Sequence, residues 1–432
     1  MPTPSLLIVP ARFKSGKLYS QLPTSGAGDF TVTRATNATR VNASGLIESV
    51  ASGIPRLDYF ASDGTVGCPA LLVEPSGTNT LSGSVSLDTG WTITADTIVT
   101  SGIISPSGST NATLFQATNT ASRVRQTATL ASGSTYTFSC FGKFGALSSG
   151  FSLNVFDENA ASYGSGVCQA FNLNEGTLGA SGTIGAGFTL QSVGMENYGS
   201  GWYRCRMTVL MGYTPTTPRV GFRIGTQISG RPLSVASGTV NAWGAQLETG
   251  SVATSYIPTT TATVTRNADV VSVTGAVSRS IGQTEGTMYA EVDVRLLSTN
   301  RSLLSLTLNS NTTDFINFQI NTSNRLFARM RNKSGSLVDV VASGVTTTAG
   351  IHKLACSYSS GDITFALDGV VIGTNTNANT DFTAALNCVL LGAGPGAATG
   401  GTQSAFLNDR ILDAALYTTR LSNAELAALT SL

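Results

Sequence analysis

The sequence predicts an all-β, multidomain fold: an irregular N-terminal module, two antiparallel β-sandwiches of the jelly-roll kind and a short C-terminal helix. Three observations support this prediction. Short runs of alternating apolar and polar residues recur along most of the chain, separated by turns rich in Gly, Ser, Asn and Asp. Only 11% of the residues are charged, and 47 are glycine. A chain of 432 residues is too long for one apolar core, so two or three domains are expected.

Residues 1–80 show little periodicity and are expected to dock on something else. Their central stretch, DFTVTRATNATRVNASG at 29–45, alternates only briefly and ends in a turn signal. A segment this irregular cannot easily build a core of its own. We expect it to be an anchoring module that packs on a neighbouring domain or on another subunit.

Residues 81–255 are predicted to form the first sandwich. Runs such as TYTFSCFGKF at 135–144, FSLNVFD and RVGFRIG recur between turns rich in Gly and Ser, as in a sandwich or jelly roll. In the first of these runs a strand would place Tyr136, Phe138 and Cys140 on one face.

Residues 256–275 are predicted to form an extended and fairly stiff connector. The stretch SYIPTTTATVTRNADV is rich in Thr, which favours extended backbone, and Pro258 biases Ile257 away from the helical region. Its string TVTR, at 263–266, also occurs at 31–34. The repeat indicates either one shared role, such as equivalent contacts at a trimer axis, or chance in a Thr-rich chain.

Residues 276–432 are predicted to form the second sandwich. In TMYAEVDVRLL the apolar and charged residues alternate, so a strand points its apolar side chains one way and Glu291, Asp293 and Arg295 the other. The apolar set comprises Met288, Ala290, Val292 and Val294.

Two local signals in this last segment predict its turns and its end. Asp368-Gly369 between apolar runs predicts a two-residue β-hairpin. Ser422 followed three residues later by Glu425 fits a capping box, which predicts a short terminal helix.

Charge and hydropathy argue against two classes of partner. The formal net charge is +1 and no basic run exceeds two residues, so the basic stripe of a nucleic-acid partner is missing. No stretch approaches the roughly 18 apolar residues of a membrane span. The start, MPTPSLLIVPARFKSG, lacks the basic region of a secretory signal, so synthesis in a cytosol is expected.

Cysteine and histidine usage argues against metal, cofactor and triad chemistry. The six cysteines are scattered and are expected to be free thiols, and His352 is the only histidine, without a carboxylate partner nearby in sequence. Four aspartates are candidate calcium ligands but form no Asp-x-Asp-x-Asp cluster, so we expect turn roles for them; they are Asp362, Asp368, Asp381 and Asp409.

Several phrases resemble known families. FTVTRATNATRVNASGLIESVASGIPRLDY and CPALLVEPSGTN resemble an N-terminal module of tailed-bacteriophage fibre and head-spike proteins. GSGWYRCRMTV and VNAWGAQLETGSVATSYIPTTTATVTRNADVV resemble the carbohydrate-binding jelly rolls that follow it there. GTMYAEVDV, HKLACSYSSGDITFALDGVVIG and RLSNAELAALT resemble the concanavalin A-like, laminin-G-type sandwich.

The resemblance implies a virion surface protein of a tailed phage, made in the cytoplasm of the bacterial host. It implies a homotrimeric fibre or spike that residues 1–80 anchor to capsid or tail proteins. Its sandwiches would bind glycans of the cell surface or the environment. The alternative is an architectural role, decorating the capsid or joining tail parts without binding sugar.

Five residues are candidates for glycan contact: Trp202, Tyr203, Glu291, Asp293 and Arg295. Sugar sites stack aromatic rings on pyranose faces, although core packing is the favoured alternative for each of the three tryptophans.

Glu291 and Asp293 share a strand face, as do the carboxylates of concanavalin A-like glycoside hydrolases with the pattern Glu-x-Asp-x-Glu or Glu-x-Asp-x-x-Glu. Arg295 or Leu296 stands here in place of the second Glu. We therefore expect no enzyme and no catalytic residue, and a solvated face with an Arg295 ion pair. A polysaccharide depolymerase, with its carboxylate pair assembled from another subunit or a distant segment, is the less favoured alternative.

Overall fold

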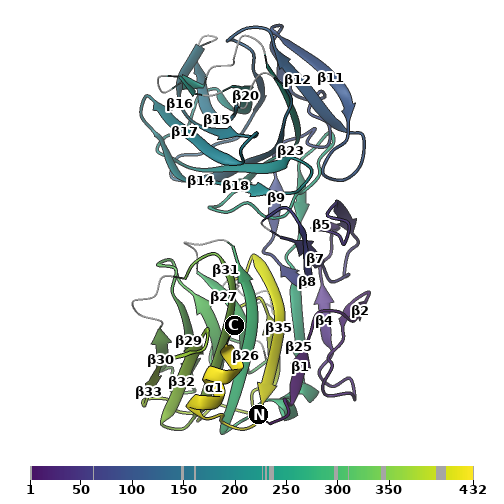
Figure 1. The fold of residues 1–432 in the computed structure, drawn as a ribbon. Helices are drawn as coiled ribbons and strands as arrows, with labels where there is room; N and C mark the ends of the chain where they lie inside the picture. The colour runs from purple at the N-terminus through teal and green to yellow at the C-terminus, as the bar shows by residue number, and fades with distance from the viewer. Residues whose placement is uncertain are drawn as a thin grey trace.

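The computed structural model describes residues 2–61, 63–146, 150–159, 162–225, 227–228, 231–232, 238–295, 300–309, 311–341, 347–395 and 405–431. Within these ranges the chain forms strands β1 to β35, a 3-10 helix at Ala276–Ser280 and one α-helix, α1 (Asn423–Thr430). The strands lie in two lobes, joined by short strands along one side, and both chain ends lie on the lower lobe (Figure 1). The predicted all-β fold with sandwich domains is confirmed.

The upper lobe consists of two six-stranded antiparallel sheets. One, the β20 sheet, has the order β10 (Thr92–Ile93), β13 (Val124–Thr127), β20 (Pro218–Ile224), β15 (Gly150–Asn159), β16 (Ser162–Asn172), β17 (Thr177–Ile184). The other, the β23 sheet, has the order β11 (Thr97–Ile103), β12 (Ala112–Ala117), β23 (Gly238–Thr249), β14 (Thr135–Phe144), β19 (Trp202–Met211), β18 (Phe188–Asn197). Side chains from both sheets, Phe151 and Phe138 among them, share one buried cluster.

The lower lobe is a larger sandwich. Its β26 sheet has the order β33 (Val370–Asn375), β32 (Asp362–Leu367), β31 (Gly350–Ser359), β26 (Glu285–Val294), β35 (Asp409–Tyr417), β8 (Val66–Val73), β7 (Leu57–Phe60), and β1 (Leu6–Ile8) also pairs with β35. Its β27 sheet has the order β2 (Phe13–Lys14), β3 (Lys17–Leu18), β4 (Phe30–Thr33), β25 (Val270–Thr274), β34 (Cys388–Leu391), β27 (Arg301–Thr307), β28 (Phe315–Ile320), β29 (Leu326–Arg331), β30 (Leu337–Val341).

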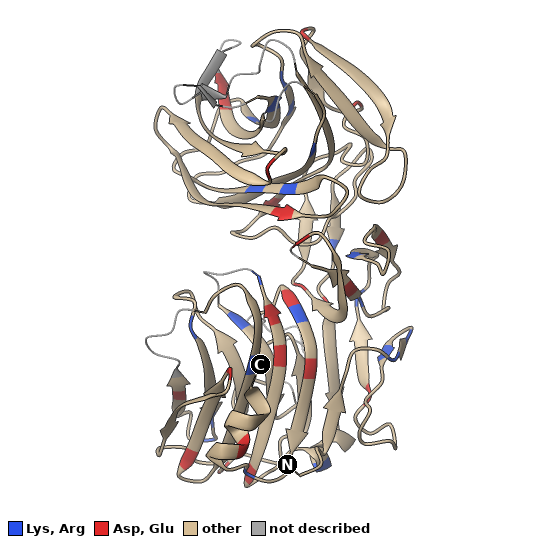
Figure 2. Ribbon diagram, in the orientation of Figure 1, with Lys and Arg blue, Asp and Glu red and all other residues tan. Residues whose placement is uncertain are grey.

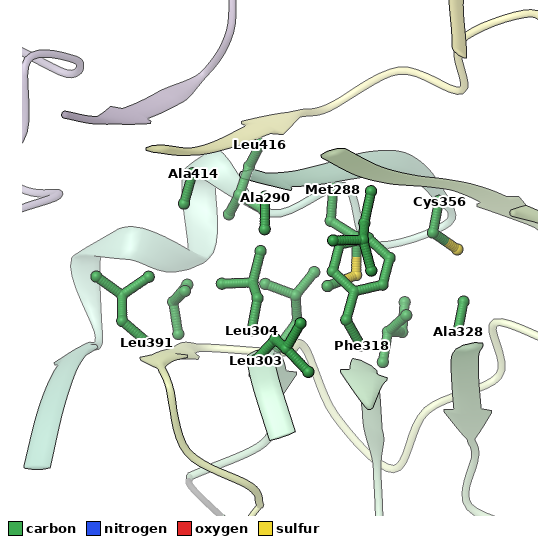
Figure 3. Packing of buried hydrophobic residues seen from close by; sticks show 14 of the residues in the cluster. Met288, Ala290, Leu303, Leu304, Phe318, Ala328, Cys356, Leu391, Ala414 and Leu416 are labelled. Carbon is green, nitrogen blue, oxygen red and sulfur yellow. The ribbon is translucent and has the colours of Figure 1, made fainter. Parts of the chain in front are cut away.

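The main core of the molecule lies between these two sheets (Figure 3). Met288 and Ala290 of β26 point into it, together with Leu304 and Phe318 of the opposite sheet. Val292 and Val294 belong to the same cluster, so the predicted inward face of β26 is confirmed. Alternation on a strand with one buried face fixes this arrangement, because a slip of one residue would bury the charged set.

Strands of the first segment complete both sheets of the lower sandwich. β1, β7 and β8 extend the β26 sheet, and β2 to β4 extend the β27 sheet. Of the two docking partners expected for residues 1–80, the structure shows a neighbouring domain of the same chain. The boundaries predicted after residues 80, 255 and 275 stay predictions, since pairing runs across them.

The connector is extended and forms strands with distant partners. β24 (Val264–Arg266) pairs with β9 (Gly77–Asn79), and β25 lies between β4 and β34. The connector therefore links the two lobes while its second half is a strand of the lower sandwich.

The two TVTR strings end at one buried ion network. Arg34 Nη1 lies 2.7 Å from Asp269 Oδ1, and Arg266 Nη1 lies 3.2 Å from Glu74 Oε2. Arg56 pairs with both carboxylates. The arginine side chains are at most 1% exposed and pair with carboxylates of the same chain. They are therefore not available for contacts at a trimer axis.

The local signals are confirmed. Asp368 and Gly369 take φ values of 48° and 81°, as a two-residue hairpin between β32 and β33 requires. Ser422 caps α1 in a complete capping box with Glu425. The six cysteines are free thiols, and all but Cys68 are buried. The described part of the chain holds no helix long and apolar enough to cross a membrane.

Candidate functional site

The predicted charged face of β26 lies on the outer side of the lower sandwich, beside β35, and Figure 2 shows acidic residues on both strands. Glu291 lies opposite Asp413 of β35, and Asp293 lies opposite Arg410. On the other side of β26, Glu291 lies opposite Lys353. α1 packs on strands β31 to β33 of the same sheet, so it covers only part of this face.

Asp293 is an ion-pair residue. Arg295 Nε lies 3.2 Å from its Oδ2, which confirms the expected ion pair, and Arg410 also donates to it. Burial acts to raise the pKa of Asp293, but Arg410 and Arg295 together hold it below the ordinary value. A carboxylate stabilised in its charged form is poorly suited to act as a general acid.

Asp413 is the acidic residue that sequence reasoning missed. Burial and the neighbouring Glu291 raise the pKa of Asp413 from 3.8 to about 6. Its Oδ1 atom is buried and has no hydrogen-bond partner among the described residues. The signal was present only as a single Asp in an apolar strand, 122 residues after Glu291 (413 minus 291), and only the pairing of β26 with β35 brings the two together.

Arg295 lies where the first segment meets the lower sandwich. Its guanidinium stands 4.1 Å from the centre of the Phe60 ring, and its Nη2 donates to the Phe60 carbonyl at 2.9 Å. Its backbone N–H donates to Asp409 at 3.1 Å. Through these contacts Arg295 connects the first segment, at Phe60, to the lower sandwich, at Asp409.

Trp202 is 2% exposed and packs in an aromatic cluster that includes Phe141, Trp243 and Tyr256. The other tryptophans are also buried, so the favoured core-packing role is confirmed for all three. Tyr203 is partly buried against the core of the upper sandwich. Trp202 therefore offers no free ring face for a sugar.

Trp202 and Arg295 approach one junction from opposite lobes. Tyr198, which packs against the Trp202 cluster, has its ring centroid 4.5 Å from that of Phe60, the ring under Arg295. A cavity of about 70 Å³ lies at this junction, and residues of the first segment, the upper lobe and the lower sandwich line it. Ligand pockets usually measure about 300–1,000 Å³, so this cavity fits a few waters and no sugar ring.

Two wider hollows flank the connector, each of about 370 Å³. One is polar and lies between Ser82, Gln126 and residues 261–263. The other lies between residues 36–39 and the connector at Tyr256–Pro258. Their volume reaches the lower range of small-ligand sites.

His352 has a carboxylate partner, which the sequence did not reveal. Its Nδ1 lies 2.7 Å from Asp368 Oδ2 across the hairpin, and its Nε2 lies 2.9 Å from the Thr348 carbonyl. Burial lowers the pKa of His352, but the Asp368 and Thr348 hydrogen bonds outweigh it and raise the pKa above the ordinary value. The partner lies 16 residues away in the sequence, and His352 lies near the start of β31, as expected.

The candidate calcium aspartates have separate partners. Asp362 pairs with Arg420, Asp381 with Lys333 and Asp409 with Arg301, while Asp368 contacts His352. Among the described residues no three His, Cys, Asp or Glu side chains gather as a metal site would require.

Comparison with known proteins gives one family match. Residues 265–427 match the Concanavalin A-like lectin/glucanases superfamily, in its laminin-G form. No curated protein sequence matches the chain.

Solved structures of similar fold include carbohydrate-binding modules. The Ruminococcus gnavus IT-sialidase CBM40 is 18% identical, with 36% of this chain and 88% of that one covered and a TM-score of 0.32. A SAP-like pentraxin from Limulus polyphemus is 13% identical over 34% and 70% of the two chains, with a TM-score of 0.28. Domain 4 of a GH43 arabinanase from Geobacillus stearothermophilus, solved with arabinotriose, is 15% identical over 38% and 73%, with a TM-score of 0.30. Residues 265–427 of this chain are a concanavalin A-like lectin/glucanase domain.

Proposed function

We propose that this chain is a non-enzymatic adhesion protein whose concanavalin A-like domain binds glycans. The observation that supports this most is the match of residues 265–427 to a superfamily of lectins and glucanases. The outer face of β26 and β35, beside α1, offers charged hydrogen-bonding groups for sugar hydroxyls. Of the five candidates, Glu291 remains a direct contact in this proposal. Asp293 and Arg295 act by holding the face in place.

A glycan array of the intact, labelled chain tests the binding role. We expect saturable binding to at least one family of bacterial surface or environmental glycans, weakened by Glu291→Gln. Thr374→Ala, on β33 of the same sheet, serves as the matched control. Failure of the intact, folded chain to bind any glycan on a broad array would contradict the proposal.

We further propose that the protein is a fibre or spike on a tailed-phage virion, built as a homotrimer. The resemblance of residues 30–59 and 68–79 to fibre and head-spike modules supports this placement. Weak binding at one site becomes useful avidity when three copies act together. Residues 1–80 would hold capsid or tail proteins through surfaces that their pairing with the lower sandwich leaves exposed, such as the one around Leu46 and Val66.

Electron cryomicroscopy of particles separates this proposal from the architectural alternative. If residues 1–80 contact capsid or tail proteins and both lobes point into solvent, the fibre role is supported. If both lobes lie enclosed between other virion proteins, the chain is a joint and the adhesion role is wrong. Light scattering of the purified chain measures the trimer, and a monomer at all concentrations would contradict that part.

A second candidate function, glycoside hydrolysis, has one observation in its favour: the carboxylates of Glu291 and Asp413 on facing strands. Directly opposed residues have Cβ atoms about 4.5–5.5 Å apart, which permits the carboxyl separations of about 5–9.5 Å that glycosidases use. A pKa of about 6 would let Asp413 donate a proton near neutral pH. Release of reducing sugar that is lost in both Asp413→Asn and Glu291→Gln would establish it, and no release from host glycans would remove it.

A further inference from the structure

The outer face of the β20 sheet in the upper lobe carries a cluster of four arginines, three of which pair with one glutamate. Val124, Val220 and Phe222 point into the core, so their neighbours on β13 and β20 point outward. These outward residues are Arg123, Arg125, Arg219 and Arg223, and Figure 2 shows basic residues gathered on and beside β20. The cluster belongs to no feature assigned above.

Strand register places the arginines around Gly221. Arg219 and Arg223 flank Gly221 on β20, Arg125 lies opposite Gly221 on β13, and Asn154 lies opposite it on β15. Gly221 has no side chain, and a Cβ there would collide with the Val124 carbonyl oxygen and lie 2.8 Å from the Arg125 Cα. β13 and β20 therefore pack closely at Gly221, which brings Arg125 near Arg219 and Arg223.

The Glu158 carboxylate of the same chain already binds three of these arginines. Glu158 accepts from Arg125, its Oε2 lies 3.0 Å from Arg219 Nε, and its Oε1 lies 3.4 Å from Arg123 Nη2. Arg123, Arg125 and Arg219 surround this one carboxylate, so their three guanidinium charges exceed its charge by two. The arginines around Glu158 are 15–23% exposed and the carboxylate 8%, so the site is partly shielded from water yet reachable.

The cluster has unmet hydrogen-bonding capacity. Asn154 is 2% exposed and Ser152 is fully buried, and Asn154 Oδ1 and Ser152 Oγ have no partner among the described residues. The Nε atoms of Arg123 and Arg125 are also buried without a partner in this part of the chain. Burial, and to a smaller extent the neighbouring Arg123, Arg219 and Arg223, lower the pKa of Arg125 to about 10.

We propose that this arginine cluster is an anion-binding site of the upper sandwich that takes the acidic group of a saccharide, a carboxylate or a sulfate. Planar guanidinium groups bind such groups in bidentate fashion, and the Asn154 and Ser152 groups suit the flanking hydroxyls. This site goes beyond the proposed glycan contact of the lower sandwich and lies in a different domain. Such a site would make the protein bind acidic polysaccharides more tightly than neutral ones.

Calorimetric titration of the intact chain with trigalacturonic acid, its methyl ester and a sulfated disaccharide tests the site. We expect the acid or the sulfated sugar to bind and the neutral ester, which differs only in charge, to bind at least about tenfold more weakly. Binding should weaken as ionic strength rises from about 0.01 M to 0.15 M and the Debye length falls from about 30 Å to about 8 Å.

Three variants locate the binding. Arg223→Gln should weaken it about tenfold, as loss of one charged hydrogen bond does. Glu158→Gln should strengthen it, because the internal carboxylate no longer competes for the arginines. Arg206→Gln is the matched control, since Arg206 lies on β19 of the other sheet, where its Nε is 3.8 Å from Glu196.

The following outcomes overturn the proposal: no binding of any acidic probe, equal binding of acid and ester, or equal loss in Arg206→Gln and Arg223→Gln. If Glu158→Gln does not fold, the comparison of trigalacturonic acid with its methyl ester and the Arg223→Gln variant still test the proposal. The arginine cluster lies outside residues 265–427. If Arg223→Gln loses binding of the acidic probes but keeps its binding on the glycan array, the glycan contact of the lower sandwich is unaffected. Failure of this proposal is therefore distinct from failure of the proposed function.

Discussion

At the junction of the lobes, Glu74 accepts hydrogen bonds from Ser255 of the connector and pairs with Arg56 and Arg266. Burial acts to raise the pKa of Glu74, but the two arginines and Ser255 outweigh it and lower the pKa from 4.5 to about 2. The carboxylate therefore contributes stability in its charged form. It joins three segments that lie far apart in the sequence.

We expect Glu74→Gln to destabilise the protein by about 3–5 kcal/mol, because it leaves buried arginines without their counter-charge. The folded pKa lies below the unfolded one, so the contribution of Glu74 is fully present above about pH 4.5. It is lost as the pH falls toward about 2, by about 3 kcal/mol in total. Urea unfolding at several pH values measures both effects. A variant as stable as the wild type, with the same acid limb, would show that the network contributes nothing.

Asp413 should have the opposite dependence on pH. Its folded pKa of about 6 lies above the ordinary 3.8, so the folded state binds the proton more tightly and loses stability as the pH rises between these values. Because Asp413 is partly exposed, we expect a loss of about 1–2 kcal/mol rather than the full linkage value. Asp413→Asn should therefore be more stable than the wild type at pH 7 and no more stable at pH 4. A stability difference that does not change with pH would contradict the raised pKa.

The residue scale also shows the limit of sequence reasoning. The face shared by Glu291 and Asp293 follows from the two-residue period of a strand and was predicted correctly. The partners Asp413 and Arg410 could not be predicted from the sequence, because cross-strand neighbours depend on which strands pair. The pairing of Arg34 and Arg266 in one network likewise needed the fold.

At the scale of elements, local signals were enough where the structure is local. The capping box predicted α1, and Asp-Gly predicted the hairpin of β32 and β33. Strands β1 to β4 of the first segment were not predicted, because runs of two to four residues carry almost no periodicity. Their partners β25 and β35 lie more than 200 residues away in the sequence.

Ser422→Ala should cost about 1 kcal/mol, because the Glu425 N–H at the start of α1 loses its acceptor. Ser431→Ala is the control at the other end of the helix, where the Ser431 hydroxyl is exposed and donates only to the Ala428 carbonyl. We expect it to change the free energy of unfolding by less than about 0.5 kcal/mol. Equal effects of the two substitutions on urea unfolding would contradict the role of the cap.

At the scale of the whole molecule, the chain closes on itself. Leu6, Ile8, Phe30 and Val32 of the first segment lie in the main core with residues from the C-terminal half. The lower sandwich is thus built from both ends of the sequence. The jelly roll between them is one continuous insertion in the sequence of the lower sandwich.

Deletion of residues 1–80 should therefore damage the lower sandwich as well as any anchoring. It would remove β4 from β25 and β8 from β35 and uncover the core beside them, and exposed strand edges promote aggregation. We expect the shortened chain to aggregate or to melt at a lower temperature, while deletion of residues 2–4 changes little. A fully stable, monodisperse chain of residues 81–432 would contradict this account.

In the proposed function, the concanavalin A-like domain contacts glycan. Hydrogen–deuterium exchange of the intact chain, with and without the strongest ligand from the glycan array, tests it most directly. We expect slower exchange on the outer face of β26 and β35, within residues 265–427. Unchanged exchange throughout those residues at saturating ligand would contradict it, and protection confined to β13 and β20 would assign glycan binding to the arginine cluster alone.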